Sequence, residues 1–386
     1  MRINKSIKIF MTIGIVLLPL ILSSCWDKKE INERAFVNTL YIDKNYARTQ
    51  SEFISSDLKK RDDERLFVSF GIANASEGET RLTTFVHSAT GVSLGNIVEK
   101  LNGEITRTPF FGHTKLIVLG KGLLGEPELL SMVLDGLERE MSIGRELKII
   151  ASESSNVTLE DLRPNIETLY SSYIVGVMEQ SDSISYTIPM NMGEFFNDIR
   201  KGDGRAILPV VRIKDNILML DKMALIDKYK LKEMLGPGEI AGYKLFHGLK
   251  VNMREYIKAN DVLTTLRISD IKRSVYYSGG GNVPKFLIKY SIEGDVTNYK
   301  FAKQIFNDTA MKKLQDELKK HLKVQLTETT DFFQDKIKID YLGLGDYVKK
   351  FHPIEYKKYK NWDKAFESAE ISFDINLDMI RLSDSK

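Results

Sequence analysis

The chain of 386 residues has few of the side chains from which compact catalytic and metal centres are built. One cysteine excludes an intrachain disulfide framework and a cysteine-rich zinc site, and the five histidines are scattered. A formal net charge of +3 is far below the basic balance of nucleic-acid-binding domains, so we expect no nucleic-acid partner. Its content of 42% hydrophobic and 28% charged residues is ordinary for globular proteins and excludes a wholly disordered or fibrous chain. The length suits two or three domains.

The first 25 residues, MRINKSIKIFMTIGIVLLPLILSSC, carry the most distinctive pattern of the chain. Three basic residues, Arg2, Lys5 and Lys8, precede an apolar run from Ile9 to Leu22. That run suits a signal-peptide core and is shorter than the roughly 18 to 20 residues of a comfortable spanning helix. The only cysteine, Cys25, then follows two serines, and Leu-Ser-Ser-Cys is similar to a bacterial lipobox. The alternative is an uncleaved N-terminal anchor with a cysteine placed there by chance.

We therefore predict a lipoprotein signal peptide at residues 1–24 and a diacylglyceryl group on the thiol of Cys25, the good nucleophile at this position. Two acyl chains hold a protein stably at a membrane, which one chain does not. The signal peptide carries three of the 56 basic residues and no acidic residue, so the mature chain keeps 53 basic against 53 acidic residues. A neutral body cannot find an anionic membrane by net charge, and the lipid is expected to supply the location.

The segment 25–185 alternates strand and helix patterns, which predicts a mixed α/β domain. Apolar and alternating runs predict strands, and apolar residues at helical spacing predict helices. The expected strands are 35–42, 66–73, 83–88, 115–119 and 147–151, and the expected helices are 91–101, 126–140 and 166–178. The polar segment 44–64 is expected to be an exposed loop. The Ser-, Asn- and Asp-rich stretch 181–204 suits a connection between domains.

Two further domains are expected, a small β-rich one at 186–270 and an α+β one at 271–386. In the first, short strands at 206–213, 217–220 and 223–226 are separated by turn signals, a helix at 230–235 stops at Gly-Pro-Gly, and strands follow at 245–251 and 262–268. In the second, a strand at 285–293, helices at 301–323 and 330–339, and a closing strand at 371–380 are expected. The predicted fold class is α+β, with three mixed α/β domains in an elongated arrangement after a cleaved signal peptide.

The sequence contains no catalytic constellation, and we predict no enzyme activity, no cofactor and no metal. It has neither a Gly-x-Ser-x-Gly elbow nor a His-Glu-x-x-His pair. The glycines at 279–281 lack the Gly-Lys-Ser/Thr of a phosphate loop, so a flexible turn is the better interpretation, as it is for Gly343-Leu344-Gly345.

Three other features have an ordinary structural interpretation beside a functional one. Glu138, Glu140 and Glu146 have no histidine at ligand spacing, which favours a solvated helix face. His113 has no identifiable acid or nucleophile as a partner, which favours a structural role. The stretch 349–364 holds six lysines against two acids. It either lies against anionic headgroups or a partner, or is a solvated helix end whose aromatic residues, Tyr356, Tyr359 and Trp362, dock on the core.

Three stretches of the chain resemble the Ger(x)C family, the lipoprotein C subunits of spore germinant receptors of Bacillus-type bacteria. The first is Cys25-Trp-Asp-Lys-Lys-Glu-Ile-Asn-Glu33, followed by a strand that ends at Ile42-Asp43. The second is Gly112-His-Thr-Lys115, leading into 116–119. The third is Asp340-Tyr-Leu-Gly-Leu-Gly-Asp-Tyr347, which runs to Trp362 and the closing strand 371–381. They follow the order of the family over nearly the whole chain, and the segment 44–64 departs from it as an insertion.

The resemblance implies a non-catalytic subunit of a nutrient germinant receptor with integral-membrane partner subunits and a three-domain α+β architecture. Its lipid would lie in the inner spore membrane, with the domains on the outer face. Whether this subunit contacts the nutrient stays open. A substrate-binding lipoprotein of a transporter is the alternative, but it needs two similar lobes around a cleft, and the dissimilar middle and C-terminal regions argue against it. A lipid-anchored cell-wall hydrolase needs a nucleophile or paired carboxylates, which we cannot place.

Overall fold

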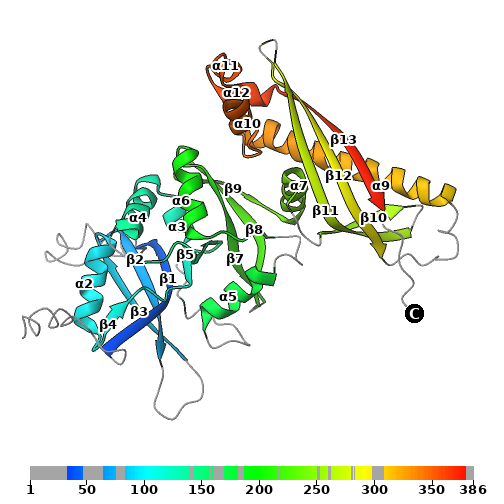
Figure 1. The fold of residues 1–386 in the computed structure, drawn as a ribbon. Helices are drawn as coiled ribbons and strands as arrows, with labels where there is room; N and C mark the ends of the chain where they lie inside the picture. Colours follow the sequence, from blue (N-terminus) through cyan, green and yellow to red (C-terminus); the bar gives the residue numbers. More distant parts are fainter. Residues whose placement is uncertain are drawn as a thin grey trace, which may run out of the picture.

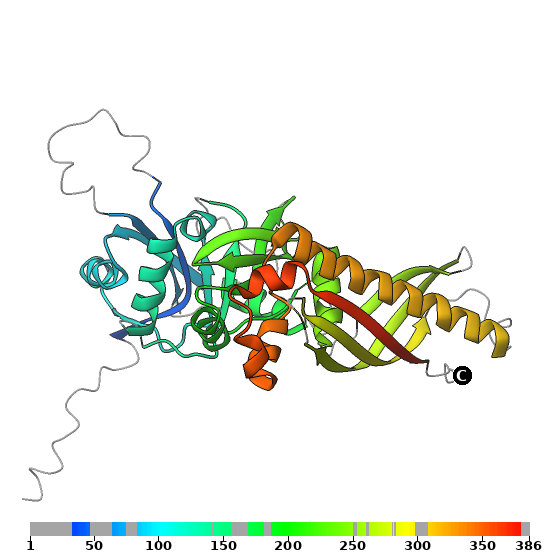
Figure 2. The same ribbon diagram turned by 90° about the horizontal axis from the view of Figure 1, so that it is seen from above.

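The computed structural model has two β-sheets, which lie toward opposite ends of the molecule (Figures 1 and 2). It describes residues 33–46, 64–74, 83–139, 142–155, 159, 169–180, 187–215, 217–249, 253–259, 262–279, 281, 283–297 and 308–379. The predicted signal peptide, Cys25 and most of the segment 44–64 lie outside these residues. No helix among the described ranges is long and apolar enough to cross a membrane.

The first sheet has nine strands in the order β3-β2-β1-β5-β6-β7-β8-β9, with β4 paired to β1. Its centre, β1-β5-β6-β7, is parallel, and its two outer parts are antiparallel. The strands are β1 (Arg34–Lys44), β2 (Leu66–Asn74), β3 (Thr83–Gly91), β4 (Thr108–Phe110), β5 (Leu116–Leu119), β6 (Lys148–Ser152), β7 (Ala206–Lys214), β8 (Ile217–Asp227) and β9 (Lys230–Leu235).

Helices cover both faces of this sheet, which explains why its central strands are continuous apolar runs. Successive side chains of a strand point to opposite faces, so Leu40 and Ile42 of β1 enter one core while Tyr41 enters another. Helices α2 (Leu94–Glu104), α3 (Lys121–Leu124), α4 (Pro127–Arg139) and α6 (Met192–Lys201) contribute buried residues to the first core. Helix α5 (Tyr170–Glu179) contributes to the core on the opposite face.

The strands β7, β8 and β9, which we call the shared meander, belong to two cores at once. Ala206, Leu208 and Val210 point into the core of the first sheet. Ile207 of the same strand points the other way, into a core that also contains α7 (Pro237–His247) and the second sheet. Because alternate residues serve different cores, the meander joins the N-terminal and C-terminal halves as a common wall.

The second sheet has four strands in the order β10-β11-β12-β13, and one long helix lies along it (Figure 1). The strands are β10 (Met253–Ala259), β11 (Val262–Ser278), β12 (Lys285–Thr297) and β13 (Glu370–Met379). Helix α9 (Asp308–Asp331) buries four leucines at four-residue spacing, Leu314, Leu318, Leu322 and Leu326. It continues into a π-helical turn (Phe332–Ile337), and α10 (Leu344–Phe351), α11 (Pro353–Tyr356) and α12 (Trp362–Glu367) precede the closing strand.

The mixed α/β character is confirmed, but four local predictions are wrong. The strands expected separately at 217–220 and 223–226 are one continuous strand, β8. The expected helix at 230–235 is strand β9, whose residues alternate between exposed and less exposed. The expected strand at 245–251 begins inside α7, which ends at His247, and residues 250 and 251 lie outside the described residues. Pro237 begins this helix, where its missing N–H costs nothing. The expected connection 181–204 contains α6, which an Asn191–Glu194 capping box begins. The middle segment 186–270 has no sheet of its own, and the division into three domains stays a prediction.

Candidate functional site at the junction of the two halves

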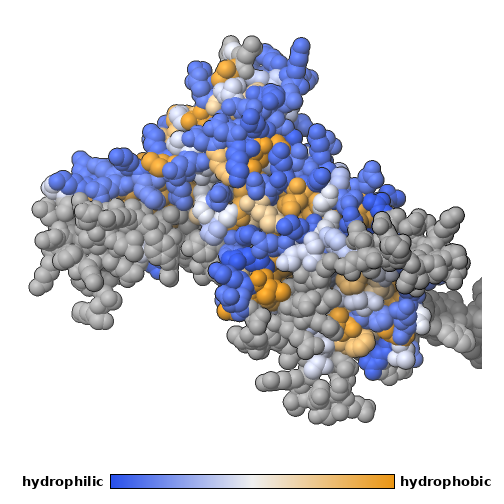
Figure 3. Space-filling model, turned by 180° about the vertical axis from the view of Figure 1, so that it is seen from behind, coloured by the Kyte–Doolittle hydropathy of each residue, from blue (hydrophilic) through white to orange (hydrophobic). Residues whose placement is uncertain are grey.

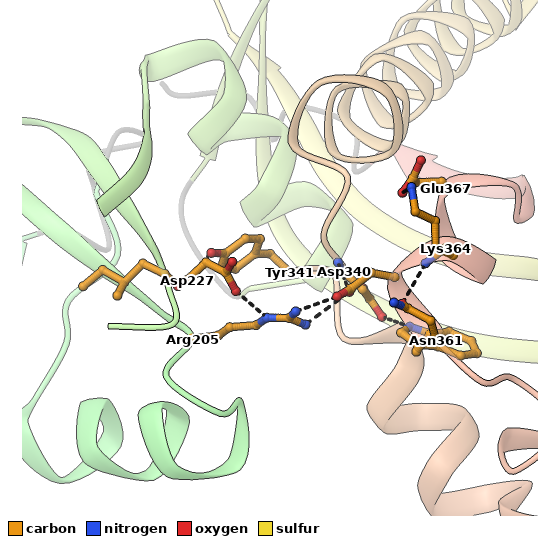
Figure 4. A network of polar contacts seen from close by, with 10 residues as sticks. Arg205, Asp227, Asp340, Tyr341, Asn361, Lys364 and Glu367 are labelled. Carbon is orange, nitrogen blue, oxygen red and sulfur yellow. Dashed lines mark hydrogen bonds and ion pairs between the residues drawn. The ribbon is translucent and has the colours of Figure 1, made fainter. Parts of the chain in front are cut away.

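An arginine joins the two halves of the molecule where the shared meander begins. Arg205 directly precedes β7, and its Nε donates to Oδ1 of Asp227 at 2.8 Å, at the end of β8. Its other two nitrogens donate to both carboxylate oxygens of Asp363, at 3.1 and 2.5 Å. Asp363 lies 158 residues further along the chain, in the first turn of α12. We call these three residues the Arg205 clasp (Figure 4).

The clasp is partly shielded from solvent. The side chains of Arg205, Asp227 and Asp363 are 28%, 18% and 22% exposed. Burial alone would lower the pKa of Arg205, but the hydrogen bonds that it donates to Asp363 and then to Asp227 outweigh burial and raise the pKa further above its already high value. The two-pronged arginine–carboxylate contact is both stronger and more directional than a single ion pair.

The Asp340–Tyr347 stretch forms the C-terminal side of this junction. The carboxylate of Asp340 accepts from the backbone N–H groups of Gly345 at 2.6 Å and Leu344 at 3.3 Å, at the start of α10. It also accepts from the indole Nε1 of Trp362 at 2.7 Å. Burial raises the pKa of Asp340, while these three hydrogen bonds act in the opposite direction. The aspartate therefore fastens the first turn of α10 to the first turn of α12.

Two tyrosines and two glycines complete the stretch. The hydroxyl of Tyr341 donates to the carbonyl of Ile226 in β8 at 2.7 Å, and that of Tyr347 donates to Val275 in β11 at 2.7 Å. Gly343 has a φ of 72°, which favours glycine. A Cβ on Gly345 would lie 2.4 Å from the Trp362 indole nitrogen. The stretch thus makes contacts that need these residue types. Tyr341 joins it to β8, and the other contacts hold the C-terminal side of the junction together.

A cleft of about 630 Å³ lies beside the clasp, with walls from both halves. Asp198 and Lys201 at the end of α6 face Asp346 and Lys349 of α10 across it. Burial, and after it the charge of Glu194, raises the pKa of Asp198. The cleft is therefore polar and of mixed charge, and it does not resemble the largely apolar pockets that enclose small organic ligands.

A histidine lies at the base of this cleft on the C-terminal side. The His247 ring packs 4.3 Å from the ring of Tyr243, and its Nε2 has no hydrogen-bond partner among the described residues. Burial, and after it the positive charge of Arg273, lowers the pKa of His247 to about 3. A neutral imidazole that packs against the Tyr243 and Phe246 rings fits a structural role.

Within the described ranges, no group of three or more His, Cys, Asp and Glu side chains could hold a metal ion. Glu138 pairs with Arg145 at 3.2 Å and with Arg200, and Glu146 is exposed. Glu140 lies outside the described residues. Gly279 follows β11 and Gly281 precedes β12, as expected for a turn between strands.

The second stretch of the resemblance, Gly112–Lys115, is structural as well. The Thr114 hydroxyl donates to the carbonyl of Val37 in β1 at 3.0 Å. His113 is exposed, packs on Phe36 and Phe110, and makes no hydrogen bond or ion pair with any residue described here. The interpretation of His113 as structural agrees with these contacts.

The strand end at Ile42-Asp43 fixes the start of a short helix. Asp43 accepts from the backbone N–H of Leu123 in α3 at 2.8 Å and from the Tyr41 hydroxyl at 2.9 Å. Cβ atoms on Gly120 and Gly122 would lie 2.1 and 2.8 Å from the Asp43 side chain. Two glycines therefore leave room for the carboxylate to cap α3 from a neighbouring strand.

The sequence did not indicate the Arg205 clasp. Arg205 follows an ordinary Gly-Asp-Gly turn, and no local pattern links it to an aspartate 158 residues away. The family resemblance included three residues to which the sequence assigned no role, and the structure brings them together: Asp340, Gly345 and Trp362. His247 carried no signal, since it lay in a segment expected to be a strand.

Comparison with known proteins finds spore germination proteins that match both halves of the chain. A family model described as "Spore germination protein N-terminal domain" matches residues 27–213, and one described as "Spore germination B3/ GerAC like, C-terminal" matches residues 221–383. "Spore germination protein KC" of Bacillus subtilis (strain 168) is 23% identical over 95% of this chain and 92% of its own length. "Spore germination protein A3" of the same organism is 22% identical over 93% of this chain and 94% of its own length.

A solved structure has the same fold. The "Crystal Structure of the GerBC protein" matches with a TM-score of 0.59 and 16% sequence identity, over 92% of this chain and all of that one. Agreement at so low an identity shows a shared fold, including the order in which the two halves are joined.

Proposed function

The chain belongs to the GerAC family of spore germination proteins, the C subunits of germinant receptors, and from this premise we propose that it is a lipid-anchored, non-catalytic coupling subunit. It holds integral-membrane partner subunits in a defined arrangement during nutrient-triggered germination. Matches to both halves in family order, from residue 27 to residue 383, support this assignment.

The contacts at the junction are the observation that carries the coupling role. The stretches that carry the resemblance build contacts within each half, through Asp43, Thr114 and Asp340. Tyr341 of the third stretch also reaches the carbonyl of Ile226 in β8. The Arg205 clasp and the shared meander then join the halves. Halves that are joined by ion pairs and by a common β-wall suit a subunit that transmits a change of arrangement between partners.

The anchor in this proposal is a diacylglyceryl group on Cys25, in the inner spore membrane, with the body on its outer face. The lipobox pattern at Leu22–Cys25 supports it. Replacing Cys25 by Ala is expected to release the protein from the membrane fraction and to weaken nutrient germination, while the body keeps its circular dichroism spectrum and its unfolding midpoint. An unfolded Cys25→Ala body would contradict a purely anchoring role.

The alternative, a substrate-binding lipoprotein of a transporter, has less support. It requires two similar lobes around a cleft, and the halves here differ. One has a nine-stranded sheet with helices on both faces, and the other a four-stranded sheet with one long helix along it.

Germination of spores that lack this protein tests the proposal. We expect loss of a nutrient response, with a normal response to a trigger that bypasses nutrient receptors. Re-expression of the full chain should restore the response. Normal responses to every nutrient in the deletion strain, with nutrient uptake impaired instead, would favour the transport lipoprotein.

A further inference from the structure

The end of α10 and the turn α11 present exposed apolar side chains inside a cluster of lysines. Ile354 is 73% exposed and Phe351 is 58% exposed, the highest fractions among the large apolar side chains that the structure describes. Five exposed lysines lie on α10 or follow α11 in the same stretch, and none of the five forms an ion pair with a described residue: Lys349, Lys350, Lys357, Lys358 and Lys360. The Nζ of Lys350 lies 5.1 Å from the centre of the Phe351 ring. We call these seven residues the lysine tip.

We propose that the lysine tip docks on an anionic lipid surface, with Phe351 and Ile354 entering the headgroup region. Lysines near such a surface are attracted individually, at roughly fivefold in partitioning for each. Their long aliphatic stems let the charges stay among the headgroups while neighbouring apolar side chains go deeper. The combination of apolar residues with a basic surround is typical of segments that lie in a membrane interface.

Little of the charge of the tip is balanced by nearby acids, and Lys349 is the tip lysine that shares the junction cleft with Asp198 and Asp346. The stretch 349–364 has two acids, and Asp363 is held by Arg205. Glu355 is then the remaining acid against five lysines without an ion-pair partner in the described chain. The sixth lysine, Lys364, pairs with Glu367 at 2.8 Å. A strongly positive surface therefore exists locally on a chain whose mature body is neutral overall.

The residues beneath the tip are already packed against the core, so docking would need to fix few further side chains. The Tyr356 ring stacks on Trp362 at 5.5 Å, and His352 packs on Tyr277 at 4.9 Å. Pro353 begins α11, and the Phe351 ring packs against Tyr347 at 4.9 Å. The aromatic residues of the stretch thus dock on the core, as one of the two sequence interpretations expected, while Phe351 and Ile354 are left outside.

The tip lies on a side of the molecule that can reach the same membrane as the anchor. In Figure 2 the orange α10–α11 segment and the start of the blue strand β1 both lie toward the lower side of the view, and Figure 1 shows that they are far apart along that side. Residue 25 is nine positions before Arg34, and nine extended residues span at most about 30 Å. The opposite face, in Figure 3, has only small separate hydrophobic patches among the coloured residues. This step rests on the lipidation of Cys25 in the proposed function.

A single labelled cysteine tests the proposal in the full lipidated chain. Once Cys25 carries its lipid, Ile354→Cys provides one free thiol for an environment-sensitive fluorophore. Ile217→Cys is the matched control, because Ile217 is 56% exposed but lies on β8. Both proteins are reconstituted on vesicles of phosphatidylcholine alone and of an equimolar mixture with phosphatidylglycerol.

On the anionic vesicles we expect a severalfold rise and a blue shift of emission at position 354, with quenching by nitroxide-labelled lipid, and no change at position 217. Adding Lys350→Glu, Lys357→Glu and Lys358→Glu should reduce the response at 354 at least tenfold. Unchanged emission at 354 would refute the proposal, and an equal response on neutral vesicles would refute its electrostatic basis. A response that requires the integral-membrane subunits would assign the tip to a protein partner instead.

A failed anchor gives a different result from a failed tip. If Cys25 carried no lipid, both labelled proteins would have a second reactive thiol, that of Cys25, and would not stay bound to neutral vesicles. That result would contradict the proposed lipid anchor. Anionic vesicles added to that unanchored protein would still raise the emission at position 354 if the tip binds lipid, and would leave it unchanged if it does not.

Discussion

Replacing Arg205 by Met should loosen the junction between the halves, and Arg212→Met provides a closely matched comparison. Arg212 makes the same two-pronged contact, with Asp221, but inside the β7–β8 hairpin. Its side chain and that of Asp221 are 19% and 17% exposed, close to the values in the Arg205 clasp. Methionine keeps much of the aliphatic length of arginine, so both variants remove mainly the guanidinium.

The expected cost follows from the contacts that are lost. Removing one partner of a fully buried ion pair costs about 3–5 kcal/mol, because the other charge is left unpaired. Exposed pairs contribute about 0–1 kcal/mol. The Arg205 clasp lies between these limits. Arg205→Met leaves two carboxylates, Asp227 and Asp363, without their cation, although Asp363 still accepts from the Asp340 N–H, so we expect a loss of about 2–3 kcal/mol. Arg212→Met leaves one, and we expect about 1–2 kcal/mol.

Chemical denaturation measures both losses, and hydrogen exchange locates them. In Arg205→Met, backbone amides of α10 and α12 should lose protection while those of α2 and α4 keep theirs. In Arg212→Met, α10 and α12 should be unaffected. Spores carrying Arg205→Met at normal protein level should respond more slowly to nutrient than spores carrying Arg212→Met. Equal protection of α10 and α12 in the two variants, or equal germination, would refute the coupling role of the clasp.

Two further predictions concern the residues beside the clasp. Because the pKa of His247 is lowered to about 3 in the folded protein from 6.5, the unfolded chain binds the proton first, and stability is lost as the pH falls below about 6.5. At about pH 5 the loss of stability attributable to His247 is at most about 2 kcal/mol. Denaturation curves of His247→Gln should lack this loss. An identical pH dependence of stability in the two proteins would refute the role of His247. Gly345→Ala should lower stability by about 1–3 kcal/mol and shift Trp362 emission to the red, since its Cβ would meet the indole nitrogen. Gly238→Ala is the control, because a Cβ on Gly238 would have nothing within 4 Å; it should be neutral or stabilising by up to about 1 kcal/mol. Equal effects of the two glycine substitutions would contradict the steric explanation.

Local pattern predicted much of the fold. The runs at 115–119 and 147–151 correspond to the parallel neighbours β5 and β6, because a strand buried on both faces is apolar throughout. The helix at 126–140 and the closing strand at 371–380 are also confirmed. Their hydrophobic periods are regular, and their ends carry ordinary signals.

The remaining elements depended on contacts that are distant in sequence. Strand β9 has the composition of a helix, with three Lys or Glu residues among six, and becomes a strand by pairing with β8. The Gly-Pro-Gly at 236–238 fits a helix end or a helix start, and the Glu239 side chain, accepting from the Gly236 N–H, decides for a start. The candidate site was least predictable, because the clasp requires both halves to be folded before Arg205 meets Asp363.

The shared meander has a consequence for how this chain can be divided. The two family models meet between residues 213 and 221, at the turn between β7 and β8. A cut at that turn would separate β7 from its antiparallel partner β8, and with it from β9, and each fragment would present an unfinished core to water. The two segments are thus separable as sequence patterns but not as modules, so a chimera that exchanges halves between relatives should place its crossover after β9.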